Sequence, residues 1–160
     1  MSARAERLAQ EFSAANDELL GMLERATPEQ WLSLTSDERE LRSVAVIAHH
    51  VAEAHVRIAR RVEAFATGRS VPARRPELFD ARNAAEARDN PEPDQRATIE
   101  RLRTTGAAVY ELIGALSDDD LERTGAEDAG AESLTTAQVI ELRQIGHVRS
   151  HLVSIRTVLG

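Results

Sequence analysis

The chain has 160 residues, which is long enough for one domain with its own core, and we expect this domain to span residues 1–160. Its net charge of −7 argues against a nucleic-acid binder, whose surface would carry a basic patch. It contains no cysteine, so thiolate metal sites and a cysteine nucleophile are excluded, and any metal must be held by His, Asp or Glu. The N-terminus has no signal-peptide pattern and no apolar run approaches the roughly 18–20 residues of a membrane span, so we expect a cytoplasmic protein without a membrane partner.

The first part of the chain predicts two long helices. Apolar residues three and four positions apart indicate a helix over residues 3–25, and Thr27, followed by a proline, is typical of a helix that restarts after a short break. The second long helix should begin after Ser43, a suitable N-cap, and run to about Thr67, where Gly68 is a stop signal. Each helix carries an apolar stripe, so each should bury one face.

Residues 68–94 form an unusually long connection. Four of the five prolines lie in it, and we expect a short helix over residues 78–88 within it. Long connections in small domains are often functional, and in a four-helix bundle such a segment can cross over between two parallel helices. Asn83 or the pair Arg74 and Arg75 could contact an anionic ligand from this segment, although loop arginines are more often simply solvated.

The last part of the chain predicts two further helices and no strand. The third helix is expected over residues 94–116, followed by a capped acidic turn at 117–120 and a polar link over 124–133. The final helix should begin at Thr135 or Thr136. Since only 3% of the residues are aromatic, the core must be built from aliphatic side chains, which suits packed helices. The sequence therefore predicts an all-α protein, a four-helix bundle.

Two of the five histidines share one face of the predicted final helix. His147 and His151 are four positions apart, which brings their Cβ atoms to roughly 5–6 Å on a helix. Both flank the apolar stripe on its inner side, where bundles build metal sites from facing helices. Val148 follows His147, so the zincin motif, which needs Glu there, is absent. The pair can hold one divalent cation together with a third ligand.

The second predicted helix offers that third ligand. Because a helix turns about 100° per residue, His50 lies on the inner flank of the apolar stripe and His49 lies on the opposite, polar face. This geometry favours His50 and does not exclude His55, on the other flank. A core histidine is more often hydrogen-bonded than metallated, so His49 and His55 are expected to be structural. His50, His147 and His151 would form a triad with an open position, as in catalytic rather than structural sites.

Four segments of the chain resemble the DinB superfamily. Residues 44–55 are similar to its second-helix segment, and residues 144–156, with HxxxH followed by an apolar tail, are similar to its final helix. Residues 116–124 resemble the stretch before that helix, and residues 79–83 resemble a stretch of its crossover. Together these segments span nearly the whole chain. The sequence departs from the family at residues 37–42, where members often have Gly-Trp.

The resemblance implies an up-down-down-up bundle with the long crossover between the second and third helices. It implies a divalent metal, most often nickel or zinc, on His50, His147 and His151 near one end of the bundle. It also implies a homodimer, and a function related to the superfamily's mycothiol-dependent maleylpyruvate isomerases or bacillithiol transferases. Unlike two-domain maleylpyruvate isomerases, this chain is expected to have no second domain.

Three functions are compatible with such a site. The primary hypothesis is a metal-dependent transferase or isomerase that uses a small-molecule thiol, such as mycothiol or bacillithiol, on an electrophilic metabolite or xenobiotic. The alternatives are a metal-dependent hydrolase, because a metal lowers the pKa of bound water towards about 7, and a non-catalytic, stress-related binding module. A solvent-connected pocket beside His147 would favour an enzyme, and an occluded metal face would favour the binding module.

Overall fold

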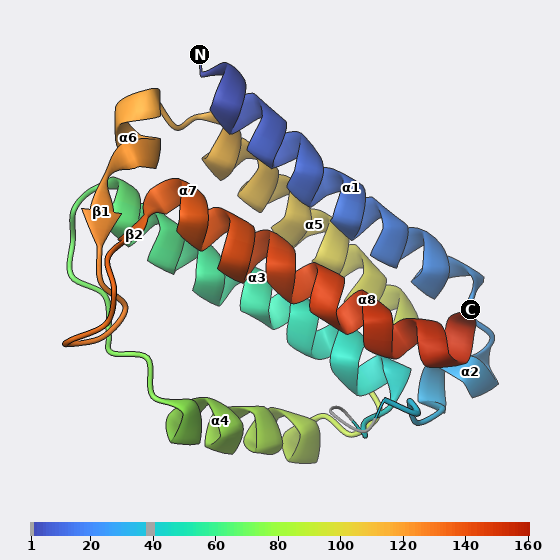
Figure 1. The fold of residues 1–160 in the computed structure, drawn as a ribbon. Coiled ribbons are helices and arrows are strands. Elements are labelled where there is room, and N and C mark those ends of the chain that lie inside the picture. Colours follow the sequence, from blue (N-terminus) through green and yellow to red (C-terminus); the bar gives the residue numbers. More distant parts are fainter. Residues whose placement is uncertain (1, 38–40) are drawn as a thin grey trace.

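The computed structural model describes residues 2–37 and 41–160, so residues 38–40 of the segment that departs from the family pattern lie outside the described part. Helices make up most of the described chain (Figure 1). In chain order the helices are α1 (Ala3–Arg25), α2 (Pro28–Leu32), α3 (Val44–Ala66), α4 (Pro76–Asp89), α5 (Gln95–Gly114), α6 (Asp118–Glu122), α7 (Thr136–Val139), the π-helical η1 (Ile140–Ile145) and α8 (Gly146–Leu159). Of these helices, none is long and apolar enough to cross a membrane.

The four long helical stretches form a bundle. Figure 1 shows α1 and the continuous stretch from α7 to α8 running in one direction, and α3 and α5 running in the opposite direction. The predicted up-down-down-up four-helix bundle is therefore confirmed. Since α3 and α5 are parallel, the segment between them must cross the length of the bundle, and α4 lies within this crossover.

Side-chain caps fix where the helices begin. The hydroxyl or carboxylate oxygens of Ser2, Ser43 and Asp94 each accept a hydrogen bond from a backbone N–H in the first turn of α1, α3 and α5. Thr27 forms a capping box at the start of α2. Beyond the end of α3, Gly68 has a positive φ of 70°, a conformation that glycine adopts without strain. The helix boundaries predicted from these residues agree with the structure to within a residue or two.

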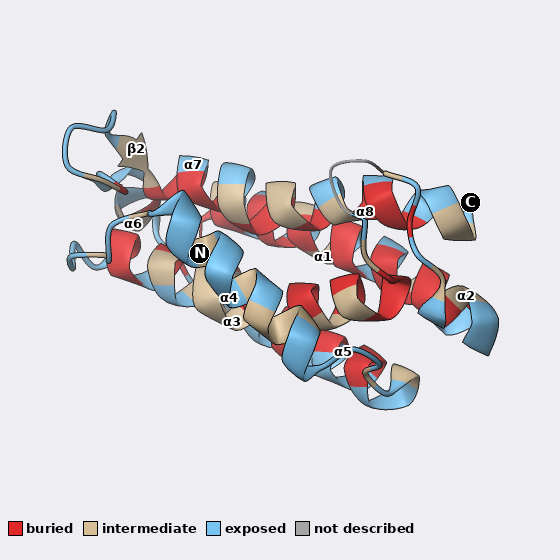
Figure 2. Ribbon diagram, turned by 90° about the horizontal axis from the view of Figure 1, so that it is seen from below, coloured by how far each residue is buried: buried red, intermediate tan, exposed pale blue. Residues whose placement is uncertain are grey.

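The core lies between the four long stretches and is mainly aliphatic. Buried side chains from all four stretches form one continuous cluster, whose aromatic members are Phe12, Trp31 and Phe65. Figure 2 shows this buried interior and the exposed outer faces. Helix α4 differs because none of its residues is buried. It lies on the outside of α3 and is held by polar side chains rather than by apolar packing.

A short strand pair corrects the expectation of a strand-free chain. β1 (Thr124–Gly125) pairs antiparallel with β2 (Leu134–Thr135), with Thr124 opposite Thr135. The prediction of no strands was wrong for these residues because a two-residue strand is too short to show an alternating pattern. The pair closes the predicted polar link and leads directly into α7, which Thr135 caps.

Candidate metal centre

Helices α3 and α8 bring three histidines together. His50 Nε2 lies 3.0 Å from His147 Nε2, and His151 Nε2 lies 3.1 Å from the same atom. A ligand atom of each residue lies within 4.8 Å of the other two. His50 is buried and the other two are half-buried. The structure thus assembles the three residues that the sequence predicted as ligands, and metal binding by them stays a prediction.

The donor set fits a divalent cation. A neutral imidazole nitrogen either donates or accepts one hydrogen bond, so His147 Nε2 cannot satisfy both neighbouring nitrogens at these distances. Burial, together with the nearby His151 and His50, lowers the pKa of His147 well below its ordinary value of 6.5. Burial also lowers the pKa of His50, against the opposing hydrogen bond with Glu86. His50 and His147 are therefore neutral at pH 7, as metal ligands must be.

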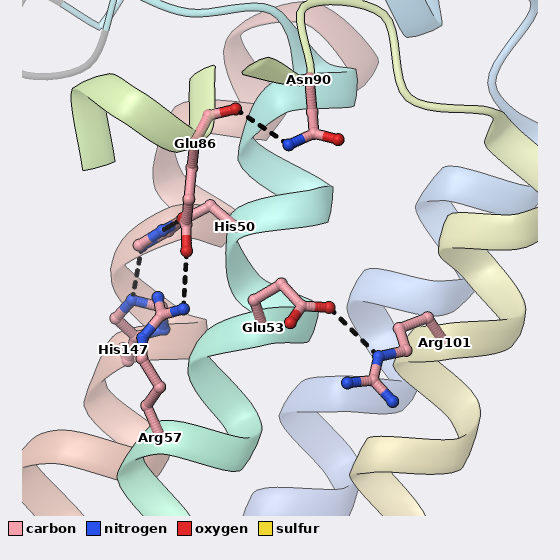
Figure 3. Close-up of polar contacts among 7 residues, drawn as sticks. All are labelled: His50, Glu53, Arg57, Glu86, Asn90, Arg101 and His147. Atoms are coloured by element: carbon pink, nitrogen blue, oxygen red, sulfur yellow. Dashed lines mark hydrogen bonds and ion pairs between the residues drawn. The ribbon is translucent and has the colours of Figure 1, made fainter. Parts of the chain in front are cut away.

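Glu86 of α4 contacts His50 on the ring nitrogen that faces away from His147 (Figure 3). Its Oε2 lies 3.3 Å from His50 Nδ1, and its Oε1 accepts a 2.7 Å hydrogen bond from Arg57. Burial raises the pKa of Glu86, but the hydrogen bond with His50 and the charge of Arg57 outweigh it and lower that pKa. An ionised carboxylate at Nδ1 fixes the proton there and leaves the Nε2 lone pair free for a metal.

Sequence reasoning missed Glu86 and Arg57. The crossover helix was predicted over residues 78–88, and the structure extends it to Pro76–Asp89. No spacing in the sequence, however, connects a carboxylate on that helix with His50, because the contact depends on how the crossover lies against α3. The regular spacing of His50 and Arg57 on α3 was the one available signal, since residues seven apart share a helix face.

The two remaining histidines are not part of the triad. His55 is fully buried, its Nε2 lies 2.9 Å from Asn16 Oδ1, and its ring packs edge-on against Phe12. Burial lowers the pKa of His55 to about 4. His49 is half-exposed on the other side of α3. Helical phase favoured His50 over His49, which agrees with this geometry. It left His55 open, and the contacts of His55 with Asn16 and Phe12 place it outside the triad.

A π-helical turn precedes His147. The predicted regular helix is interrupted by η1, at whose end the Gly146 N–H bonds to the carbonyl of Glu141, five residues back. A Cβ at Gly146 would lie 3.2 Å from that carbonyl oxygen. The fully buried Gln144 lies in this turn, and its amide has no hydrogen-bond partner among the described residues. Such π-helical turns are frequent at functional sites, and hydrophobic periodicity does not reveal them.

Helix α4 lies against His50 through Glu86. Two cavities in the described part of the chain have volumes of about 300 and 580 Å³, and neither is lined by a triad histidine, so neither is the pocket expected beside His147. One of them, of about 300 Å³, is bordered by Val46 and Ala87, the neighbours of the His50–Glu86 contact. Asn83 of α4 is half-buried with an unpartnered side-chain oxygen, whereas Arg75 is exposed.

Together, the fold and the site define a helical bundle with a candidate three-histidine metal centre between its second and last long helices. The chain belongs to the DinB superfamily, whose family model matches residues 5–155. The resemblance seen in the sequence is thereby confirmed. No curated protein sequence matches the chain significantly.

A solved structure shares the fold. YfiT from Bacillus subtilis superposes with a TM-score of 0.77 at 20% sequence identity, over 99% of this chain and 87% of that one. It is described as a probable metal-dependent hydrolase with an unusual four-helix bundle topology. At this level of identity the similarity establishes the bundle topology.

Proposed function

We propose that the protein is a metal-dependent enzyme in which His50, His147 and His151 hold a divalent cation, with nickel or zinc as the expected metals. The convergence of three Nε2 atoms on one point carries the proposal. Three protein ligands leave a coordination position for a small molecule. A divalent cation there would supply Lewis acidity that lowers the pKa of a thiol or a water molecule.

The surrounding residues have separate roles in this proposal. Glu86 holds His50 in the tautomer that directs its lone pair inward, and Arg57 keeps Glu86 ionised. Helix α4 contacts the triad through Glu86 and His50. Since no residue of α4 is buried, lifting it exposes little apolar surface, and the main cost is the loss of the contacts of Glu86 with His50 and Arg57. We infer that small molecules reach the triad when α4 moves.

A small-molecule thiol is the nucleophile that this arrangement favours. Among the contacts of His50, Glu86 supplies a carboxylate that is bound on both oxygens and has a lowered pKa. It is therefore poorly suited to accept a proton from water. A thiol has an ordinary pKa of about 8.5, far below that of free water, so a bound cation would deprotonate it without a protein base. As the chain has no cysteine, the thiol must come from a small molecule such as mycothiol or bacillithiol, which would attack an electrophilic substrate.

Each alternative has one observation in its favour. The description of YfiT as a probable metal-dependent hydrolase favours metal-assisted hydrolysis, which needs the same open position. That neither described cavity is lined by a triad histidine favours a non-catalytic binding module. A homodimer stays a prediction under all three readings.

A product assay separates these functions. The zinc-loaded or nickel-loaded protein is incubated with mycothiol or bacillithiol and monochlorobimane, and separately with a nitrophenyl ester without thiol. We expect metal-dependent thiol adduct that is lost in His151→Ala and retained in His49→Ala. Ester hydrolysis alone would transfer the assignment to a hydrolase, and neither reaction in a fully metal-loaded protein would favour the binding module.

A further inference from the structure

Five arginines, of which Arg57 lies near His50 and His147, form a group of positive charges in a chain that is acidic overall. Arg57 and Arg61 lie one turn apart on α3, Arg82 lies on α4, Arg74 on the connection before it, and Arg143 on η1. Burial, followed by the charge of Arg143, lowers the pKa of Arg74, and burial, followed by the charge of Arg57, lowers that of Arg82. These residues, here called the arginine cluster, are therefore close enough to repel one another.

The carboxylates in contact with the cluster neutralise it only in part. Glu127 is 7% exposed, accepts a 2.7 Å hydrogen bond from Arg143 and lies 3.7 Å from Arg74. Glu86 pairs with Arg57. Five guanidinium groups and these two carboxylates leave a formal charge of +3, before any cation is bound by the histidines. Such a concentration of positive charge in a protein of net charge −7 needs a physical reason.

Two of the arginines have buried nitrogens without a partner. Arg57 Nη2 and Arg61 Nη1 are both inaccessible and make no hydrogen bond to a described residue. The other terminal nitrogens of these side chains bond Glu86 and the carbonyl of Pro72. Buried polar groups are nearly always hydrogen-bonded, and an unpaired charged donor is especially unfavourable. Each of these two side chains, one turn apart on α3, thus has a guanidinium nitrogen without an acceptor among the described residues.

The arginine cluster and the candidate metal centre lie next to each other along the length of the bundle. On α3, Arg57 and Arg61 follow His50 by seven and eleven residues, which places all three on one face. On the last stretch, Arg143 precedes His147 by one turn. Because these two stretches are antiparallel (Figure 1), the arginines of both lie towards the same end of the bundle. A single Glu86 side chain links Arg57 to His50 (Figure 3).

We propose that Arg57 and Arg61 bind an oxyanion, a carboxylate or a phosphate, on the small molecule whose reactive group reaches the three histidines. The proposal rests on the proposed function and names a substrate class for it: an anionic thiol. The planar guanidinium group binds both kinds of oxyanion through paired hydrogen bonds, which lysine cannot do. The oxyanion would partner the free nitrogens and offset the charge of the cluster.

Two thiols that differ only in charge test this inference on the cobalt-loaded protein. Mercaptohexanoate and mercaptohexanol are titrated separately, and the dissociation constant is read from the thiolate-to-cobalt absorption. We expect the carboxylate to bind about tenfold more tightly in wild type, the order of one charge-assisted hydrogen bond. Arg61→Gln should abolish the preference, and Arg60→Gln, an exposed arginine on the same helix, should keep it. Competition with acetate or inorganic phosphate shows which oxyanion is preferred.

Each outcome separates this inference from the proposed function. Equal binding of the two thiols in wild type, or a preference that survives in Arg61→Gln, overturns the anion site while leaving thiol binding in place. If neither thiol changes the cobalt spectrum, thiol use is contradicted. Calorimetry of acetate and phosphate with the metal-free protein then tests the anion site separately. Binding that is weakened in Arg61→Gln supports the anion site, and no binding overturns it. Arg61→Lys, which keeps the charge but not the planar group, replaces Arg61→Gln if that variant does not fold.

Discussion

Acid should destabilise the protein through the buried His55. Its pKa is about 4 in the folded chain, against an ordinary value of 6.5. Because the unfolded chain binds a proton more readily, the free energy of unfolding falls as the pH drops below 6.5 and continues to fall down to about 4. A difference of about 2.5 pKa units at 1.36 kcal/mol each makes this loss about 3 kcal/mol, a large part of the stability of a small domain.

The contribution of His55 can be isolated with His55→Gln. Glutamine has a similar size, can still donate to Asn16 and does not titrate. Urea unfolding of the metal-free protein, followed by circular dichroism between pH 7 and pH 4, gives the free energy at each pH. The variant should lose about 3 kcal/mol less than wild type over this range. His49→Gln, the matched control at a half-exposed position of the same helix, should follow wild type. Parallel pH profiles for wild type and His55→Gln would refute the reasoning.

Two further substitutions test the site and the core. Glu86→Gln should weaken metal affinity about tenfold or more, because His50 loses its charged orienting partner. Competition with a chromophoric chelator measures this affinity. An unchanged affinity, or an equal loss in the exposed Glu77→Gln, would show that Glu86 has no such role. Gly106→Ala should lower the free energy of unfolding by about 1 kcal/mol or more, since the new methyl overlaps the buried amide of Asn16. Gly114→Ala, whose methyl meets only ordinary contact distances, should be neutral or stabilising in the same urea titration.

The bundle was predictable because its signals are local. Apolar spacing and the caps at Ser43 and Thr27 determine where helices begin, and a glycine with positive φ ends α3. The placement of His50 also followed from local geometry, since helical phase distinguishes the inner flank from the outer face. His147 and His151 are one turn apart on one helix, so their proximity needed no tertiary information.

The rest of the site depends on tertiary arrangement. Glu86 meets His50 only because α4 lies across α3, and its residues carry no apolar stripe that would predict that position. The extra hydrogen-bond turn of η1 changes the path of the chain before His147 without altering its apolar pattern. The convergence of Arg61 and Arg143 likewise comes from two antiparallel stretches. Sequence periodicity describes the faces of helices and not which faces meet.

The metal content of the protein, purified without a histidine tag, tests the central claim most directly. Inductively coupled plasma mass spectrometry of wild type, His147→Ala and His49→Ala is the measurement. We predict close to one divalent cation per chain, nickel or zinc, in wild type and His49→Ala, and its loss in His147→Ala. Stoichiometric metal retained in His147→Ala, or no metal in wild type even after incubation with nickel and zinc, would contradict the account.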